Sequence, residues 1–220
     1  MPAFAYILTV LVAYLLGSIP TGFLVARARG VDIRTVGSGN IGATNVFRIL
    51  GRAAGVFVLL VDAAKGWAAV FVAARLLAAW AYGDAAASQL VWFQLVAGVA
   101  AILGHNYTCW LHFKGGKGIA TSAGVLVALV PMSLLIILAI WVVVFACSRY
   151  VSLASICAAF ALPFAAWLLG EQRTIVLVLS VLAALAIYKH KSNIVRLLNG
   201  TENRIGGKKA AASEPPKAKV

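Results

Sequence analysis

A run rich in glycine and polar side chains occupies residues 36–48, with the sequence VGSGNIGATNVFR. Glycine lets a chain turn so that several backbone N–H groups point at one anion, and hydroxyl and amide side chains add further donors. The arginine that ends the run can grip a phosphate through two parallel hydrogen bonds. Glycines also serve tight turns, but the density of donors favours a phosphate site. Its candidate residues are Ser38, Asn40, Thr44, Asn45 and Arg48.

A second cluster surrounds the sequence KGGKG, immediately before a helix that we expect to begin near Ile119. The N-terminal end of a helix carries free N–H groups and partial positive charge, so a glycine turn with a lysine beside it favours anion binding. The nucleotide-binding pattern GxxxxGK[ST] is absent, so nothing indicates that the anion is a nucleotide. The candidate residues are Gly115, Gly116, Lys117 and Gly118.

The third cluster, YKHKSNIVRLLNGTENR, begins at Tyr188, where the last apolar stretch ends. His190 and Asn193 are three residues apart, which places them on one side of a continuous helix. One of them can then orient a substrate while the other exchanges a proton or donates a hydrogen bond. A purely structural hydrogen bond is the competing interpretation. The neighbouring cations are expected to reach for lipid head groups instead; these are Lys189, Lys191 and Arg196.

Asp62 and Lys65 lie three residues apart inside an apolar stretch, in the run VDAAKGW. An unpaired charge inside a membrane is costly, so the two side chains are expected to pair and to support the structure or the site, not to catalyse. Three dispersed histidines and six acidic residues offer no metal-binding cluster. We therefore predict no metal.

The composition identifies the class of protein that must position these clusters. Of the 220 residues, 63% are hydrophobic and 11% are charged, and the mean hydropathy is +0.97. Soluble proteins have roughly a quarter of their residues charged, so this chain is predicted to be an all-helical integral membrane protein. The net charge of +13 would suggest nucleic acid in a soluble chain. In a membrane protein, basic loops on the cytoplasmic side explain most of it, and no nucleic-acid partner is predicted.

Five apolar stretches are long enough to cross a bilayer, namely residues 3–25, 53–80, 88–104, 151–170 and 173–188. A further block, residues 118–148, forms either one bent helix or two short helices turning at Pro131. The charge pattern decides between these two possibilities. Lys and Arg gather in the segments 26–52, 105–117 and 189–220, which the positive-inside rule assigns to the cytoplasm.

The last two basic segments share a side only if an even number of spans separates them, which requires two helices in the ambiguous block. We therefore predict seven transmembrane helices, with the N-terminus outside and the C-terminus cytoplasmic. A six-span chain would place the basic tail on the wrong side. One polytopic domain is expected over residues 1–207. It is followed by a basic cytoplasmic tail, residues 208–220, whose composition is typical of disorder and of contact with anionic lipid.

Several catalytic patterns are missing from the chain. No histidine belongs to an HxxxxD dyad of the soluble acyltransferase type, and there is no GxSxG elbow of a serine hydrolase. The carboxylates are too few for a metal-dependent phosphatidyl transferase. What remains is a cytoplasmic site that is rich in phosphate donors and poor in bases, which suits substrates that are already activated and anionic.

In combination, the sequences SGNIGATNVFR, FKGGKGIAT and HKSNI followed by NGTE resemble the bacterial acyl-phosphate:glycerol-3-phosphate acyltransferases. The resemblance extends from about Gly17 to Gly207 and includes SIPTG and DAAKG. It implies a seven-span helical protein of the bacterial inner membrane with its active site facing the cytoplasm. The implied reaction moves a fatty acyl group from acyl phosphate to the 1-hydroxyl of glycerol 3-phosphate, giving lysophosphatidic acid and phosphate. This reaction opens phospholipid synthesis and needs no metal.

The resemblance also assigns roles to individual positions. The expected catalytic residues are Ser38, Lys117, His190 and Asn193. The expected substrate-binding residues add to these Asn40, Thr44, Asn45, Arg48, Gly115, Gly116 and Gly118. Within this set, the glycines are expected to shape the phosphate-binding loop. Holding the site together is the role expected of Glu202, alongside Asp62 and Lys65.

Acyl phosphate is a mixed anhydride with a good leaving group, so positioning and charge neutralisation can supply much of the catalysis. Our hypothesis passes the hydroxyl proton to a substrate phosphate oxygen, with His190 as the rival base. The competing function is a membrane transporter of an organophosphate anion, which predicts polar residues through the bilayer depth and helices broken near its middle. A lipid-binding scaffold would explain the tail but not the clustered polar residues.

Overall fold

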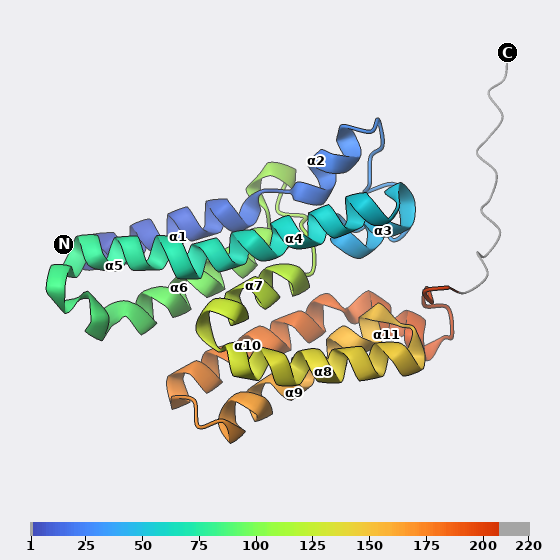
Figure 1. The fold of residues 1–220 in the computed structure, drawn as a ribbon. Helices are drawn as coiled ribbons and strands as arrows, with labels where there is room; N and C mark the ends of the chain where they lie inside the picture. Colours follow the sequence, from blue (N-terminus) through green and yellow to red (C-terminus); the bar gives the residue numbers. More distant parts are fainter. Residues whose placement is uncertain (1, 207–220) are drawn as a thin grey trace, which may run out of the picture.

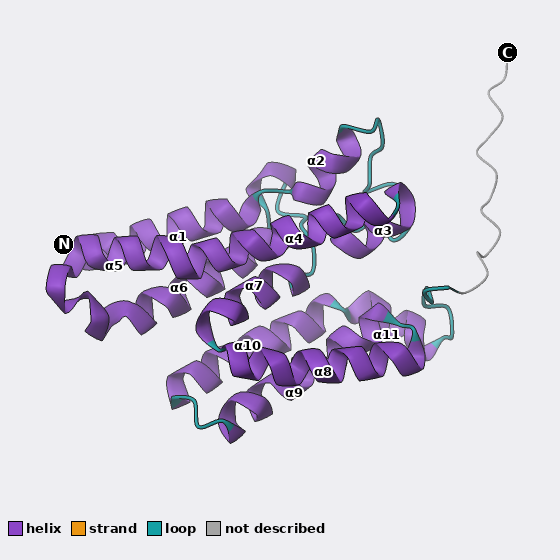
Figure 2. Cartoon of the chain, viewed as in Figure 1, coloured by secondary structure: helices purple, strands orange, loops and turns teal. Residues whose placement is uncertain are grey.

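The computed structural model describes residues 2–206, which form helices joined by short loops and contain no strand. The predicted all-helical architecture is confirmed (Figure 1, Figure 2). The predicted tail, residues 208–220, lies outside the described residues. The α-helices are α1 (Pro2–Ser18), α2 (Thr21–Arg27), α3 (Ala43–Leu50), α4 (Arg52–Ala68), α5 (Ala74–Tyr82), α6 (Ala86–Asn106), α7 (Ile119–Leu129), α8 (Pro131–Ser148), α9 (Val151–Leu168), α10 (Arg173–Lys189) and α11 (Lys191–Leu198).

The first predicted span, residues 3–25, is interrupted at Pro20, between α1 and α2. Proline has no backbone N–H and disfavours the helical conformation in the residue before it. At this break the carbonyl of Ile19 accepts the N–H of Thr21 at 3.0 Å and, from α4, Lys65 Nζ at 2.8 Å. A buried lysine therefore ties the interrupted first span to its neighbour.

The next two predicted spans, residues 53–80 and 88–104, are the arms of a helical hairpin. The first arm runs through α4, one π-helical turn (Ala69–Ala73) and α5. At Gly83, whose φ is 53°, the chain reverses into α6 (Figure 1).

Residues 118–148 form two helices, as the charge argument predicts. Val130 precedes a proline and leaves the helical conformation, with φ of −143°. Pro131 is the first residue of α8, where its missing N–H costs no hydrogen bond. Figure 1 shows α7 running to this turn and α8 returning from it.

By length and composition, four helical segments are able to cross a membrane, or five if α10 and α11 count as one bent span. One of the four, Arg52–Leu111, is a run of 60 residues that contains the hairpin. The helix α7 has only 11 residues. Seven crossings and the direction of the termini therefore stay predictions.

The three polar clusters lie at one end of the molecule. Figure 1 shows α2, α3, the loop between α6 and α7, and the junction of α10 and α11 at the same end. The turns that join α5 to α6, α7 to α8 and α9 to α10 lie at the opposite end. Segments far apart in the sequence are thus brought together where the basic residues gather.

The helices α1 and α6 approach each other closely at two glycines. A Cβ atom on Gly17 would overlap the carbonyl of Ala101, and one on Gly104 would overlap the carbonyl of Tyr14. Small residues let helices in a membrane pack backbone against backbone. The core between α1, α5 and α6 is correspondingly rich in alanine around the fully buried Phe93. This contact fixes the end of α6, where the second polar cluster begins.

The helix that follows the second cluster is fixed in the same way. Gly124 of α7 packs so closely on α4 that a Cβ atom would overlap the carbonyl of Ala63. Both ends of the glycine-rich loop are therefore attached to helices whose positions are set by close backbone packing.

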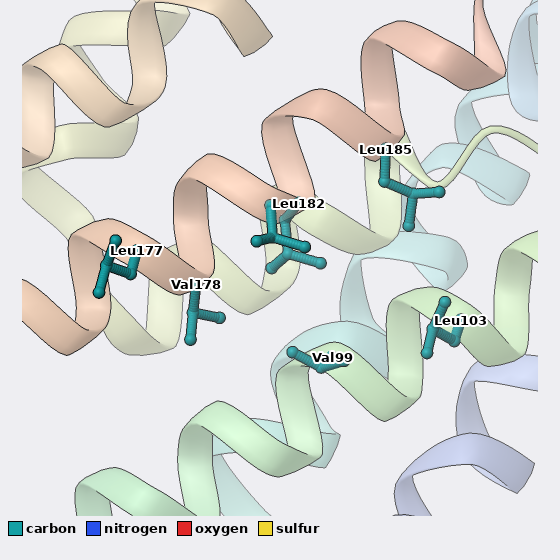
Figure 3. Close-up of a pocket in the computed structure, with 7 residues that line it drawn as sticks. Val99, Leu103, Leu177, Val178, Leu182 and Leu185 are labelled. Carbon is teal, nitrogen blue, oxygen red and sulfur yellow. The ribbon is translucent and has the colours of Figure 1, made fainter.

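The remaining helices, α8 to α10, form a core of larger side chains such as Leu162 and Leu179. Between α6 and α10 an apolar groove of about 310 Å³ remains (Figure 3). It is lined by Val99 and Leu103 of α6 and by leucine and valine side chains of α10. Its chemistry suits contact with lipid chains and offers no polar group to a substrate.

Candidate active site

The first cluster is folded around one buried amide. Asn45 Nδ2 donates to the carbonyls of Ile33, Val36 and Asn40 at 3.0–3.3 Å. Its Oδ1 accepts the backbone N–H of Ser38 at 2.9 Å. The amide is therefore engaged within its own loop, so Asn45 shapes the loop and has no donor left for a substrate.

All the residues predicted from this cluster line a cavity of about 710 Å³; they are Ser38, Asn40, Thr44, Asn45 and Arg48. The guanidinium of Arg48 is half-buried, and burial lowers its pKa, while the charge of Glu202 raises it and that of Arg196 lowers it further. Within residues 2–206, Arg48 has no salt bridge and no side-chain hydrogen bond. A half-buried cation without a protein partner favours the binding of an anion.

The glycine-rich loop divides into two parts with different roles. The N–H groups of Gly115 and Gly116 donate to the carbonyls of Asn106 and His105 at 3.2 and 3.0 Å. These two glycines are thus bound to the end of α6 and are not among the residues that line the cavity, so their part in substrate binding stays a prediction. Gly118, with φ of 81°, precedes the first turn of α7 and does line it.

Lys117 joins the second cluster to the third. Its Nζ donates to Asn193 Oδ1 at 2.5 Å, and Asn193 Nδ2 donates to Glu202 Oε1 at 2.8 Å. Ser152 of α9 donates to the same carboxylate oxygen at 3.0 Å, and Arg196 Nε donates to the other oxygen at 2.7 Å. The cluster of Lys117, Asn193, Glu202, Ser152 and Arg196 therefore connects four separate parts of the chain.

The charges in this cluster are strongly perturbed. Burial lowers the pKa of Lys117 to about 8, because the charge of Glu202 only partly offsets desolvation and the repulsion from Arg196 and Arg48. Burial alone would raise the pKa of Glu202, but hydrogen bonds from Arg196, Asn193 and Ser152 bring the net pKa below its usual value. Glu202 is therefore anionic at neutral pH, and the pKa of Lys117 lies close to neutral pH.

His190 lies at the bend between α10 and α11, where the two helix axes differ by 55°. Its Nδ1 is 2.8 Å from the carbonyl of Ala186, so Nδ1 carries the proton and Nε2 is free to accept one. Burial, followed by the charge of Lys117, lowers the pKa of His190 to about 4. The side chain lines the cavity as a neutral imidazole at physiological pH.

The cavity has a polar end and an apolar wall. The polar end is formed by the three clusters and by Gly118, Ile119 and Ala120 at the start of α7. Such a helix start offers N–H groups and partial positive charge to an anion. The apolar wall is lined by side chains from α7 to α10 that include Leu134, Trp141, Leu162 and Leu179. The shape suits a ligand with an anionic head and a long hydrocarbon chain.

Asp62 and Lys65 form the predicted ion pair, with Lys65 Nζ 2.8 Å from Asp62 Oδ1 and both side chains buried. Asp62 also lines the cavity. Within residues 2–206, no group of three potential metal ligands occurs.

Two cations expected to reach for lipid are instead bound inside the protein. Arg196 lines the cavity and pairs with Glu202, and Lys189 Nζ donates to the carbonyl of Asn106 at 3.1 Å. The prediction for these two cations was wrong, because each has an acceptor within the protein that lies within hydrogen-bond distance. Lys191 is exposed, as expected, and its ammonium contacts the hydroxyl and the ring of Tyr188.

Sequence reasoning overlooked Ser152, which lines the cavity. His105 also lines it, at a position where the sequence leaves helix capping and binding equally open. For Arg196 a signal was available, because it follows Asn193 by three residues and so shares its helix face. For Ser152 no local signal exists. Its partner Glu202 is 50 residues away in the chain.

Fold and site together define a helical membrane protein with an anion-binding cavity at one end that continues into an apolar wall. A model of the glycerol-3-phosphate acyltransferase family matches residues 7–200. The chain belongs to this family.

Individual relatives agree with this assignment. The glycerol-3-phosphate acyltransferase of Geotalea daltonii is 49% identical, over 90% of this chain and 96% of the relative. That of Geobacter sulfurreducens is also 49% identical, over 88% and 94%. The crystal structure of PlsY (YgiH), an integral membrane glycerol 3-phosphate acyltransferase, in its glycerol 3-phosphate form is 42% identical and superimposes with a TM-score of 0.80, covering 91% of this chain and 96% of that one. Its lysophosphatidic acid form gives 40% and 0.78.

The charge balance of the cluster predicts how Lys117 responds to the loss of its counter-charge. In Glu202→Gln the carboxylate that raises the pKa of Lys117 is gone, so this pKa is expected to fall below about 8. The measurement is the pH dependence of Lys117 acetylation by acetic anhydride, read by mass spectrometry. The matched control is Glu171→Gln, at the α9–α10 turn on the opposite end of the molecule. An unchanged titration midpoint in Glu202→Gln would contradict the described charge balance.

Proposed function

We propose that this protein transfers a fatty acyl group from acyl phosphate to the 1-hydroxyl of glycerol 3-phosphate, yielding lysophosphatidic acid and inorganic phosphate. The observation that carries the proposal is a single cavity that holds Arg48, Lys117 and a helix start beside a long apolar wall, with no side-chain partner for Arg48 among residues 2–206. The relatives named glycerol-3-phosphate acyltransferase, and the PlsY structures with glycerol 3-phosphate and lysophosphatidic acid, support it.

Each part of the cavity suits one part of the substrates. Arg48, Lys117 and the start of α7 bind the phosphate groups, with the hydroxyl of Ser38 as a further donor. The acyl chain lies along the apolar wall between the helices, so only its reacting end needs to meet water-soluble substrate. Asn45, Gly115 and Gly116 hold the loops in shape, while Asn193 and Glu202 hold the ammonium of Lys117.

The chemical step exchanges one acyl–oxygen bond for another. The 1-hydroxyl oxygen attacks the carbonyl carbon, the bond from that carbon to the phosphate oxygen breaks, and the hydroxyl proton ends on a phosphate oxygen. A phosphate group, with a second pKa of about 6, is a stronger base than an imidazole whose pKa lies well below the ordinary histidine value. In this site the pKa of His190 is about 4. We therefore assign proton uptake to substrate phosphate, and His190 Nε2 accepts a hydrogen bond that orients the attacking hydroxyl.

The proposal places the protein in the bacterial inner membrane as one polytopic domain. Seven helices cross the bilayer, the N-terminus lies outside, and the site and C-terminus face the cytoplasm. The basic segments 26–52 and 105–117 and the described residues 189–206 lie at the end that carries the site (Figure 1), which supports this orientation. Glycerol 3-phosphate then enters from the cytoplasm, and the acyl phosphate from the bilayer.

The orientation predicts which positions a membrane-impermeant thiol reagent reaches. After replacement of the three native cysteines, Asp84→Cys and Gln172→Cys are expected to react in intact cells. Thr35→Cys and Asn199→Cys are expected to react only after the membrane is opened. All four positions are exposed, so access depends on the side of the membrane and not on burial. Reaction of Thr35→Cys in intact cells would overturn the orientation.

The activity predicts a defined product balance. Purified protein in detergent is expected to release one phosphate per lysophosphatidic acid formed, and only when acyl phosphate and glycerol 3-phosphate are both present. Arg48→Ala is expected to lower kcat/KM for glycerol 3-phosphate by roughly 100-fold, because it removes a charged, paired phosphate contact. The matched control is Arg34→Ala, an exposed arginine paired with Asp32.

A different outcome separates acyl transfer from transport. Uptake of glycerol 3-phosphate into sealed vesicles, with no phosphate release from acyl phosphate, would contradict the enzyme and support an organophosphate transporter. The segments that carry the three polar clusters of the cavity lie at one end of the molecule (Figure 1), which favours the enzyme.

The perturbed groups predict the pH profile of kcat/KM for glycerol 3-phosphate. Lys117 binds phosphate as an ammonium, so kcat/KM is expected to fall as the pH rises through about 8, where Lys117 loses its proton.

If substrate phosphate takes the hydroxyl proton, His190→Gln is expected to retain at least roughly a tenth of kcat and to gain no new pH dependence, since an obligatory base contributes about 100-fold or more. A loss of more than about 1,000-fold in kcat would instead make His190 the base.

A further inference from the structure

The loop that carries Lys117 is bound to the last residues of α6 through its backbone. Besides the two hydrogen bonds from Gly115 and Gly116, the carbonyl of Asn106 accepts Lys189 Nζ at 3.1 Å. Lys189 directly precedes His190. One short segment of α6 therefore connects the loop of Lys117 to the end of α10 that carries His190.

Within this segment, the imidazole of His105 is wedged between a carboxylate and the loop. The side chain is buried, and its Nδ1 lies 3.7 Å from Asp62 Oδ1, which in turn pairs with Lys65. The opposite edge of the ring faces Gly116. A Cβ atom at that position would overlap His105 Nε2, and the three nearest atoms all belong to this imidazole.

This contact explains why position 116 is a glycine. Gly116 does not have a positive φ, so its backbone conformation is open to other residues. The nearest atoms that exclude a side chain there are those of the histidine ring. Gly115 differs, because a Cβ atom on it would overlap the backbone carbonyl of His105 and the backbone of Asn106, which no side-chain substitution removes.

We propose that His105 is a positioning residue, whose buried ring sets the position of Gly116 and through it the ammonium of Lys117. This inference rests on the proposed function, in which Lys117 binds the phosphate of glycerol 3-phosphate. The two ring nitrogens face Asp62 and Gly116, so the histidine acts through the loop. Without the imidazole of His105, the loop moves toward α4 and Lys117 moves away from the phosphate site.

The test is a steric double-mutant cycle on the full-length protein in detergent, with KM and kcat for glycerol 3-phosphate and the thermal midpoint as readouts. His105→Ala is expected to raise KM about 10-fold while kcat stays within about threefold and the thermal midpoint shifts little, because substrate grip is lost and not the fold. Gly116→Ala alone is expected to lower kcat/KM about 100-fold, because its methyl group displaces the loop.

In the His105→Ala background the methyl group has room, so adding Gly116→Ala is expected to change kcat/KM less than about threefold further. Gly115→Ala is the matched control, because its overlap is with backbone and His105→Ala must leave its defect in place. Where Gly116→Ala alone does not fold, recovery of folded protein in the double variant is the same supporting result.

Two results would overturn the positioning role: defects of His105→Ala and Gly116→Ala that multiply, or an unchanged KM in His105→Ala. An inactive wild-type protein would instead refute the proposed function and the assignment of Lys117 with it. In that case the thermal midpoints of the four variants still report whether His105 excludes a side chain at position 116, so the two failures are distinguishable.

Discussion

The site depends on holding three cations together in one half-buried cavity. Arg48, Lys117 and Arg196 share it, and Arg48 and Arg196 both lower the pKa of Lys117. Like charges about 4 Å apart near a protein surface repel by about 4 kcal/mol. Glu202 is the one carboxylate hydrogen-bonded to this group within the described residues, and it pairs directly with Arg196. The positive charge that Glu202 does not offset favours an anion in the cavity.

Neutral amide side chains and close helix packing hold these cations in place. Asn193 stands between Lys117 and Glu202 and satisfies both without adding charge. Asn45 organises the loop of the first cluster with a single side chain. Close backbone contacts of α1 with α6 and of α4 with α7 fix the helices at both ends of the loop that carries Lys117. Close packing of the helices positions the cations, and polar side chains form hydrogen bonds with Lys117 and Arg196.

Much of this arrangement follows from the sequence alone. Apolar length gives the helices, Pro131 gives the turn between α7 and α8, and the balance of basic segments gives the shared end of the three clusters. Residue types also identified the Asp62–Lys65 pair correctly. These features depend on local spacing or on the bilayer, which acts on every segment in the same way.

What the sequence did not reveal is which distant group each polar side chain meets. Lys117 and Asn193 are 76 residues apart, and Lys189 binds a carbonyl 83 residues away. Nothing local distinguishes a lysine that reaches for lipid from one that ties two helices together. In the same way, Gly115 and Gly116 look like phosphate-binding residues until the end of α6 is seen to occupy their N–H groups.

The central claim is that separate stretches of the chain form one anion pocket. An experimental structure of this protein with glycerol 3-phosphate tests it most directly. The account predicts a phosphate group in contact with both Arg48 and Lys117, and the 1-hydroxyl within reach of His190 Nε2. A phosphate bound by only one of the two cations, or lying outside the cavity, would contradict the account.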